Sequence, residues 1–106
     1  MKRLALAALL SASLVAFAQD AEYAIAIKDH KFSPDRIEIP AGKKVKLMVD
    51  NQDATPEEFE SHSMKVEKVI PGKSKASIFV GPLKAGEYKF VGEFNEKTAK
   101  GVIVAK

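Results

Sequence analysis

Apolar and polar side chains alternate along most of the chain from Tyr23 onward. Alternation with a period of two is typical of strands that bury one face. Turn-forming pairs such as Pro71-Gly72 and Gly81-Pro82 separate the alternating runs, which are short. The pattern predicts an all-β protein, an antiparallel Greek-key β-sandwich of seven or eight strands. The side chains expected to face the core are those of Tyr23, Ile25, Ile27, Ile37, Ile39, Val45, Leu47, Val49, Ala76, Ile78, Val80, Tyr88, Phe90, Gly92, Phe94, Val102 and Val104.

Two short segments depart from the simple strand pattern. No stretch shows a sustained helical stripe, and the one place suited to a short helical turn is Asn95–Ala99. In the strand expected over Lys43–Asp50, Met48 faces away from the core beside Lys46. Met48 is therefore either a chance surface residue or a thioether kept beside a functional site.

The first eighteen residues have the layout of a secretory signal peptide. A basic start, Met1-Lys2-Arg3, precedes an uncharged apolar run over Leu4–Ala16, and Ala16-Phe17-Ala18 forms a small-x-small cleavage site. A transmembrane anchor is the rival interpretation, but the apolar run is short for a membrane span. We therefore expect a signal peptide at residues 1–18 and one exported domain at residues 19–106.

Charge and cysteine content exclude several classes of function. Without Lys2 and Arg3, 15 of the 17 basic residues remain against 14 acidic ones, with no dense basic stripe, so nucleic acid is not an expected partner. The chain has no cysteine, which excludes thiol catalysis, iron–sulfur clusters and thiolate-bound metals. No hydrolase motif, phosphate-binding glycine loop or zinc-protease helix is present, so we expect no catalytic residues of these kinds.

The segment Asp50–Glu60 holds five carboxylates and no lysine or arginine. Elsewhere in the chain lysine outweighs the acidic residues. Carboxylates gathered on a strand can bind a cation, or they can form a solvated acidic face. The five residues are Asp50, Asp53, Glu57, Glu58 and Glu60.

Four segments of the chain resemble the cupredoxin frame. They are Phe32–Lys43, Val49–Asp53, Pro71–Lys73 and Gly86–Phe90. The resemblance covers nearly all of the exported domain and implies a cupredoxin-like sandwich. It also implies where copper relatives would carry their ligands: the first histidine at Pro56-Glu57-Glu58, the cysteine at Gly92, the second histidine at Asn95 and the methionine at Ala99 or Lys100. Because every ligand is replaced here, no type 1 copper is expected.

A closer resemblance is to the cupredoxin-like domain of EfeO-type proteins and of small periplasmic partners of bacterial iron permeases. It lies in Glu58-Phe59-Glu60, Val66-Glu67-Lys68 and Pro71-Gly72. The resemblance implies a periplasmic protein that holds iron or copper through Glu58, Glu60 and Glu67. It also implies an accessory role in high-affinity iron uptake, in ferrous iron oxidation or in handover. The implied partners are an inner-membrane iron permease and other periplasmic components, with the chain itself a monomer or weak dimer.

The strand period gives the candidate site a geometry. Glu58 and Glu60 are two residues apart and share a face, while Phe59 points to the core. Glu67 could lie across from them on the returning strand, and Glu93 follows another strand. His62 and Met64 stand in the intervening bend and offer a nitrogen and a thioether. Oxygen donors with an imidazole suit iron, Mn²⁺ or Cu²⁺ better than Cu⁺.

Other interpretations remain open. The acids could be a solvated face balanced by Lys46, Lys65 and Lys68, and His62 and Met64 could be unliganded. A metal-free adaptor would use the acidic edge to dock a basic partner, and its binding would weaken with salt. A true ferrous oxidase would need a redox-active ion of its own, and the sequence favours a non-enzymatic role. His30 is expected at the surface.

Overall fold

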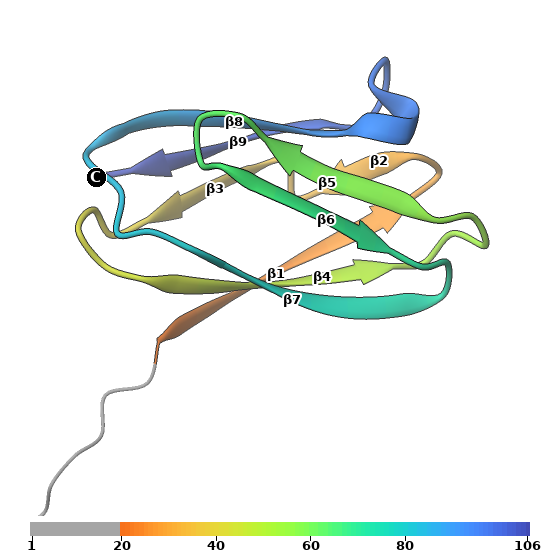
Figure 1. The fold of residues 1–106 in the computed structure, drawn as a ribbon, viewed down its shortest axis with the longest axis horizontal. Coiled ribbons are helices and arrows are strands. Elements are labelled where there is room, and N and C mark those ends of the chain that lie inside the picture. Colours follow the sequence, from red (N-terminus) through yellow and green to blue (C-terminus); the bar gives the residue numbers. More distant parts are fainter. Residues whose placement is uncertain (1–19) are drawn as a thin grey trace, which may run out of the picture.

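Two β-sheets face each other in the computed structural model, which describes residues 20–106 (Figure 1). The predicted signal peptide, residues 1–18, lies outside the described residues. Among the described residues, no helix is long and apolar enough to cross a membrane. The elements are β1 (Ala21–Lys28), β2 (Lys31–Ser33), β3 (Arg36–Ile39), β4 (Val45–Asn51), β5 (Glu57–Ser61), β6 (Val66–Ile70), β7 (Ser74–Val80), β8 (Gly86–Gly92), the 3₁₀ turn η1 (Glu93–Asn95) and β9 (Lys100–Ala105).

The predicted β-sandwich is confirmed, with two differences in detail. The described chain has nine strands, in one sheet of order β2-β1-β4-β7 and another of order β3-β9-β8-β5-β6. The extra strand, β2, has three residues and is too short to show a period. Both sheets are mixed, because β1 pairs with β4 and β3 pairs with β9 in parallel. The parallel pairs arise because the chain changes sheet between β2 and β3 and again between β3 and β4, instead of returning directly in a hairpin.

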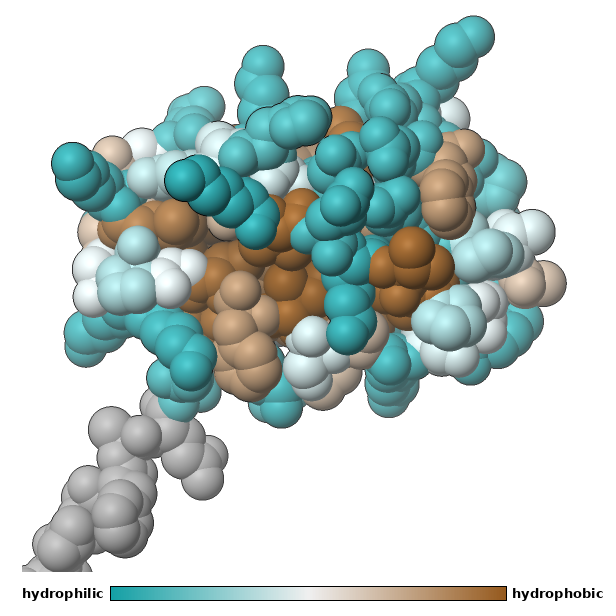
Figure 2. Space-filling model, viewed as in Figure 1, coloured by the Kyte–Doolittle hydropathy of each residue, from teal (hydrophilic) through white to brown (hydrophobic). Residues whose placement is uncertain are grey.

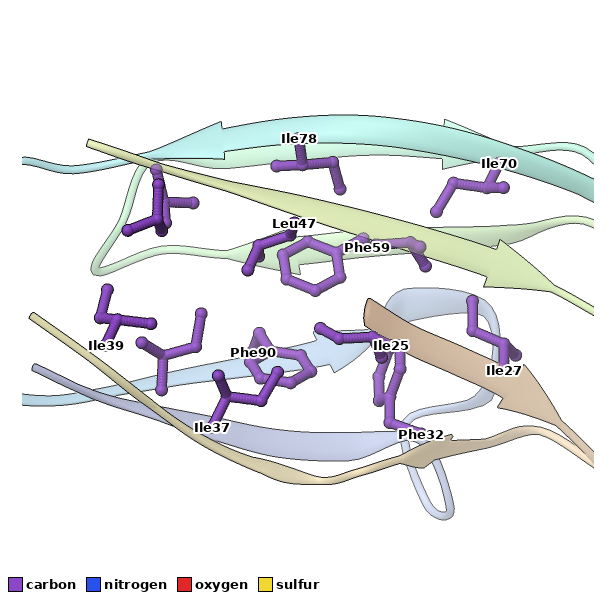
Figure 3. Packing of buried hydrophobic residues seen from close by; sticks show 14 of the residues in the cluster. Ile25, Ile27, Phe32, Ile37, Ile39, Leu47, Phe59, Ile70, Ile78 and Phe90 are labelled. Atoms are coloured by element: carbon purple, nitrogen blue, oxygen red, sulfur yellow. The ribbon is translucent and has the colours of Figure 1, made fainter. Parts of the chain in front are cut away.

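The core lies between the sheets and is centred on three phenylalanines. Phe59 and Phe90 stack with ring centroids 4.7 Å apart, and Phe32 meets the edge of Phe90 at 4.9 Å (Figure 3). Gly101 packs against the Phe90 ring, where a Cβ atom would overlap ring carbons. The three rings come from β2, β5 and β8, so they join both sheets and fix the inward face of β5.

Most of the predicted core positions are buried or packed against the core, and three are wrong. In β9 the structure buries Ile103 and Ala105, whereas Val102 and Val104 are partly exposed. Because residues 102–105 are all apolar, the sequence does not show which of them face the core. Phe94 is half exposed, since β8 ends at Gly92 and the strand period does not continue into η1.

The outer faces of the two sheets are polar. Figure 2 shows hydrophilic side chains above and below an apolar band that follows the gap between the layers. β5 lies inside its sheet, with β8 on one side and β6 on the other. A polar group on the outer face of β5 is therefore flanked by side chains from two further strands.

Candidate metal centre

The two faces of β5 separate its glutamates. Glu57, Phe59 and Ser61 point inward and are buried, while Glu58 and Glu60 are partly exposed on the outer face. Phe59 is fully buried in the aromatic cluster. The predicted arrangement, with Glu58 and Glu60 on one face and Phe59 in the core, is therefore observed.

Three outer carboxylates meet above this part of the sheet. Oxygen atoms of Glu58, Glu67 and Glu93 all lie within 4.8 Å of one another. They come from β5, from β6 and from η1, immediately after β8. Partial burial, with hydrogen bonds and like charge from Glu93 and Glu67, raises the pKa of Glu58 to about 7. A cation held between these oxygens would relieve the repulsion between their negative charges.

Glu60 extends the group along the strand. It stands directly across from Glu67 in the β5–β6 ladder. A hydrogen bond with Glu93, partial burial and the charges of Glu93 and Glu67 raise its pKa, and the nearby His62 opposes that shift. The structure therefore brings together Glu58, Glu60, Glu67 and Glu93, which we call the carboxylate cluster.

His62 and Met64 do not sit at equivalent places beside this cluster. The Nε2 atom of His62 lies 3.8 Å from Oε2 of Glu60, but the imidazole is 95% exposed. Met64 packs against the hydrophobic core, and its backbone N–H donates to Oγ of Ser61 at 3.2 Å. His62 therefore lies at the Glu60 end of the cluster, and the Met64 side chain is engaged in core packing.

Met48 lies on the other sheet, between Ala24 of β1 and Ser77 of β7 in the ladder. It faces away from the core, as the period predicts. The outer face of that sheet is the opposite side of the sandwich from the carboxylate cluster. Met48 could contribute to the candidate site only if its strand bordered the acidic pair, and β4 does not, so the structure leaves it as an outward residue of the other sheet.

The lysines expected to balance the acids do not pair with the cluster. Lys46 lies 3.9 Å from Glu22 on the other sheet. Within residues 20–106, no lysine or arginine lies within 4.0 Å of the four clustered glutamates, and the basic side chain that does is the His62 imidazole, beside Glu60.

Two residues of the Asp50–Glu60 segment, the acid Asp53 and the amide Asn51, have structural roles. The carboxylate of Asp53 accepts the backbone N–H groups of Asp29 at 2.8 Å and His30 at 3.0 Å, closing the β1–β2 turn. Partial burial raises the Asp53 pKa, but these hydrogen bonds outweigh it and the pKa is lowered. Asn51 donates to the carbonyls of Thr55 and Ile70 and so ties the loop after β4 to the end of β6.

Glu57 is the functional group that sequence reasoning passed over. It is 1% exposed. Its Oε1 accepts the backbone N–H groups of Phe94 at 2.8 Å and Glu58 at 3.1 Å, and its Oε2 accepts Nδ2 of Asn95 at 2.6 Å. The signal that could have revealed this role is the strand phase, which puts Glu57 on the same inward face as Phe59.

The four positions that the resemblance assigns to copper ligands lie together at this end of the sandwich. Gly92 donates its N–H to the Ala99 carbonyl at 2.9 Å. A Cβ atom on Gly92 would lie 2.6 Å from Cδ of Glu57 and 2.7 Å from Cβ of Ala99. Asn95 is bonded to Glu57. Because the Glu57 carboxyl fills this space and no thiolate or imidazole is supplied, these residues do not fit a type 1 copper ion.

Comparisons with known proteins agree with this architecture. The family model described as "Cupredoxin-like domain" matches residues 3–105. An uncharacterized protein of Rickettsia prowazekii (strain Madrid E) is 43% identical over 83 residues, which cover 78% of this chain and 66% of that protein. The chain thus spans just under two thirds of the length of this relative.

Two solved structures are similar in fold. Auracyanin A, described as a blue copper protein from Chloroflexus aurantiacus, has a TM-score of 0.68 at 13% identity, covering 83% of this chain and all of that one. The metal-binding domain of the Cu(I)-exporting P-type ATPase of Streptococcus pneumoniae D39 has a TM-score of 0.68 at 15% identity, covering 80% and 84%. At these identities the likeness concerns the fold alone.

Proposed function

The chain belongs to the cupredoxin-like domain family, and from this premise we propose that it is a periplasmic protein that binds a transition metal ion through carboxylates. The observation that carries the proposal is the meeting of Glu58, Glu67 and Glu93 within 4.8 Å. Three anionic oxygens at this spacing are the ligand set of a hard or borderline cation. Glu60 lies beside them and would supply a fourth carboxylate, with His62 next to it.

The ligand chemistry selects the class of metal. Carboxylate oxygens favour Fe³⁺, Fe²⁺, Mn²⁺ or Cu²⁺ over Cu⁺, which prefers sulfur donors. The raised pKa of Glu58, about 7, means that metal binding must displace a proton near neutral pH. Metal affinity therefore falls as the pH drops below 7, since protons and the ion compete for Glu58.

The proposed biological role is supported by the resemblance of Glu58-Phe59-Glu60 and Val66-Glu67-Lys68 to iron-permease-associated proteins. We propose that the protein is an accessory component of high-affinity iron uptake, which holds iron on the outside of the sheet and passes it to an inner-membrane permease. Exposure of Glu67 and Glu93 supports handover, because a partner could reach the ion directly. A second form of this proposal is that the protein also oxidises Fe²⁺, which requires an electron acceptor such as O₂.

Titration calorimetry of residues 19–106 with Mn²⁺, Cu²⁺ and anaerobic Fe²⁺ tests the binding claim. The native protein should bind, and Glu58→Gln/Glu93→Gln should lose most of its affinity because two of the three carboxylates that meet within 4.8 Å become neutral. Glu22→Gln, on the other sheet, is the matched control and should bind like the native chain. Absence of binding by the native protein, or unchanged binding by the double variant, would rule the site out.

Oxygen consumption with Fe²⁺, measured with and without added copper, separates an oxidase from a carrier. A carrier consumes oxygen no faster than free Fe²⁺ under the same conditions. A ferroxidase consumes it faster, and dependence on copper would identify the redox ion. This measurement distinguishes the two versions of the iron role once metal binding is established.

One observation favours a second candidate, the metal-free adaptor. Val69, which stands across from Glu58 in the ladder, is 50% exposed, so the cluster adjoins apolar surface. Acidic groups beside an exposed apolar side chain suit a basic partner with an apolar anchor. Partner binding in that case would weaken with salt and would be unaffected by chelators.

A further inference from the structure

Beneath the carboxylate cluster, on the inner side of β5, a second polar group ties three segments together. The Glu57 carboxylate takes three N–H donors: the backbone of Glu58 in β5, the backbone of Phe94 in η1 and the side chain of Asn95. At 1% exposure the carboxylate has little access to water. Its hydrogen bonds to N–H groups therefore replace the hydration that burial removes.

The shape of the surrounding chain is adapted to this carboxylate. Gly92 leaves room for it, since a Cβ atom there would overlap Glu57. Asn95 has a further structural task, because its carbonyl accepts the N–H of Ala99 at 2.8 Å and closes the turn after η1. Glu57 and Asn95 thus anchor the whole connection between β8 and β9 to the inner face of β5.

Two ligands of the proposed metal site are attached directly to this group. Glu93 immediately precedes Phe94, whose N–H is held by Glu57, and Glu58 immediately follows Glu57 and gives its own N–H to the same oxygen. The backbone at both positions is therefore fixed by one buried carboxylate. The outward side chains of Glu58 and Glu93 start from backbone atoms that Glu57 holds in register.

We propose that Glu57 and Asn95 are positioning residues for the carboxylate cluster, forming a buried carboxylate–amide bridge that fixes Glu93 beside Glu58. The inference rests on the proposed function where it concerns metal affinity. The same bridge fills the place that the resemblance assigns to a copper ion. A protein hydrogen-bond network there ties β5 to the β8–β9 connection, and the metal-binding groups lie on the outer face instead.

A charge-swapped pair tests the bridge. In Glu57→Gln, the amide oxygen can keep the two backbone donors as a neutral and therefore weaker acceptor, and Asn95 can turn its amide so that its oxygen accepts from the new amide nitrogen. In Glu57→Gln/Asn95→Asp, the carboxylate at position 95 accepts from the amide at position 57, which restores a charged hydrogen bond between the two positions. Asn95→Ala is a milder single variant, because it removes one donor and leaves both backbone bonds.

The first readout, hydrogen exchange at the Phe94 amide, does not involve metal. We expect Glu57→Gln to lose about tenfold in protection there, which corresponds to one weakened buried hydrogen bond. The swapped pair should recover part of that protection, because it restores a charged bond between positions 57 and 95 while the acceptor of the Phe94 N–H stays neutral, and the Ile103 amide should change far less than the Phe94 amide. Unchanged protection at Phe94 in Glu57→Gln and in Asn95→Ala would overturn the bridge itself.

The second readout is affinity for Mn²⁺ by calorimetry. Loss of a group that orients metal ligands typically costs about 10–100-fold in affinity, and we expect Glu57→Gln to show this and the swapped pair to recover most of it. Native-like affinity in a variant that has lost Phe94 protection would overturn the positioning role. If the native chain binds no Mn²⁺, the proposed function and the positioning role fail together, while the exchange data still decide on the bridge.

Discussion

The two faces of β5 show how differently neighbouring glutamates can behave in one strand. On the inner face, Glu57 is surrounded by N–H donors and holds the chain together. On the outer face, Glu58 is surrounded by carboxylates and has a pKa raised to about 7. The comparison shows that the partners of a carboxylate, rather than its exposure alone, decide whether it stabilises the fold or is available to a cation.

The largest effect should come from removing the inner carboxylate. Glu57→Ala leaves the N–H groups of Phe94 and Asn95 without acceptors in a buried site, and we expect a loss of about 3 kcal/mol of unfolding free energy. Urea denaturation measures this loss. Glu87→Ala, at an exposed position of β8, is the control, for which we expect a change within about 0.5 kcal/mol. Equal losses of unfolding free energy in the two variants would contradict the stabilising role of the buried Glu57 carboxylate.

Crowding the inner site should be the next largest effect. In Gly92→Ala the new Cβ atom would lie 2.6 Å from Cδ of Glu57 and 2.7 Å from Cβ of Ala99. Overpacking of this kind typically costs about 1–3 kcal/mol. Thermal and urea unfolding of Gly92→Ala should be compared with that of Gly42→Ala. Nothing lies within 4 Å of a Cβ atom at Gly42, but its φ of +78° favours glycine, so Gly42→Ala measures a backbone effect without crowding. A Gly92→Ala protein as stable as the native one would show that this space is not filled.

The outer face should give a smaller effect that depends on pH. The folded protein holds the Glu58 proton up to a pKa of about 7, whereas the unfolded chain loses it near the ordinary value of 4.5. This contribution to stability is therefore complete below pH 4.5 and disappears as the pH rises to about 7. With a chelator present to remove metal ions, the unfolding free energy of the native protein should be lower at pH 8 than at pH 5.

Substitution of Glu58 tests the origin of that pH dependence. Glu58→Gln removes the titrating group and one negative charge of the cluster, so the fall in stability between pH 5 and pH 8 should become shallower. Urea midpoints at the two pH values give the comparison. A pH dependence identical to that of the native protein would mean that Glu58 does not titrate as the geometry implies.

The smallest effect should come from His62. Its imidazole is 95% exposed and lies 3.8 Å from Glu60, a contact at the edge of the cluster. We expect His62→Gln to reduce Mn²⁺ affinity by less than about fivefold, because an exposed contact at the edge of the site contributes under about 1 kcal/mol. Calorimetry on the same protein preparation measures it. A larger loss would make His62 a direct ligand and would extend the site toward the β5–β6 turn.

The sequence predicted the sandwich because inward residues such as Val45, Leu47 and Val49 alternate with polar ones. It did not predict the phase of β9, where consecutive apolar residues hide the period, nor β2, which is only three residues long. Nor could it reveal the parallel pairings, because pairing partners depend on where the chain changes sheet.

The candidate site was predictable in part for the same reasons. The shared face of Glu58 and Glu60 follows from strand spacing, and the approach of Glu67 follows from a hairpin. The meeting with Glu93 depends on β8 lying beside β5, a contact between residues far apart in the chain. The structural role of Glu57 depends on Asn95, which is 38 positions away in the chain. The sequence alone therefore did not distinguish Glu57 from the acidic residues of the outer face.

The most direct test of the central claim is proton release on metal binding. Calorimetric titration of metal-free residues 19–106 with Mn²⁺ at pH 6, in two buffers of different ionisation enthalpy, counts the protons released per ion. The carboxylate cluster predicts saturable binding with release of about one proton in the native protein. In Glu58→Gln, if residual binding persists, that release should be lost. Binding without proton release, or no binding at all, would contradict a metal site built on Glu58, Glu67 and Glu93.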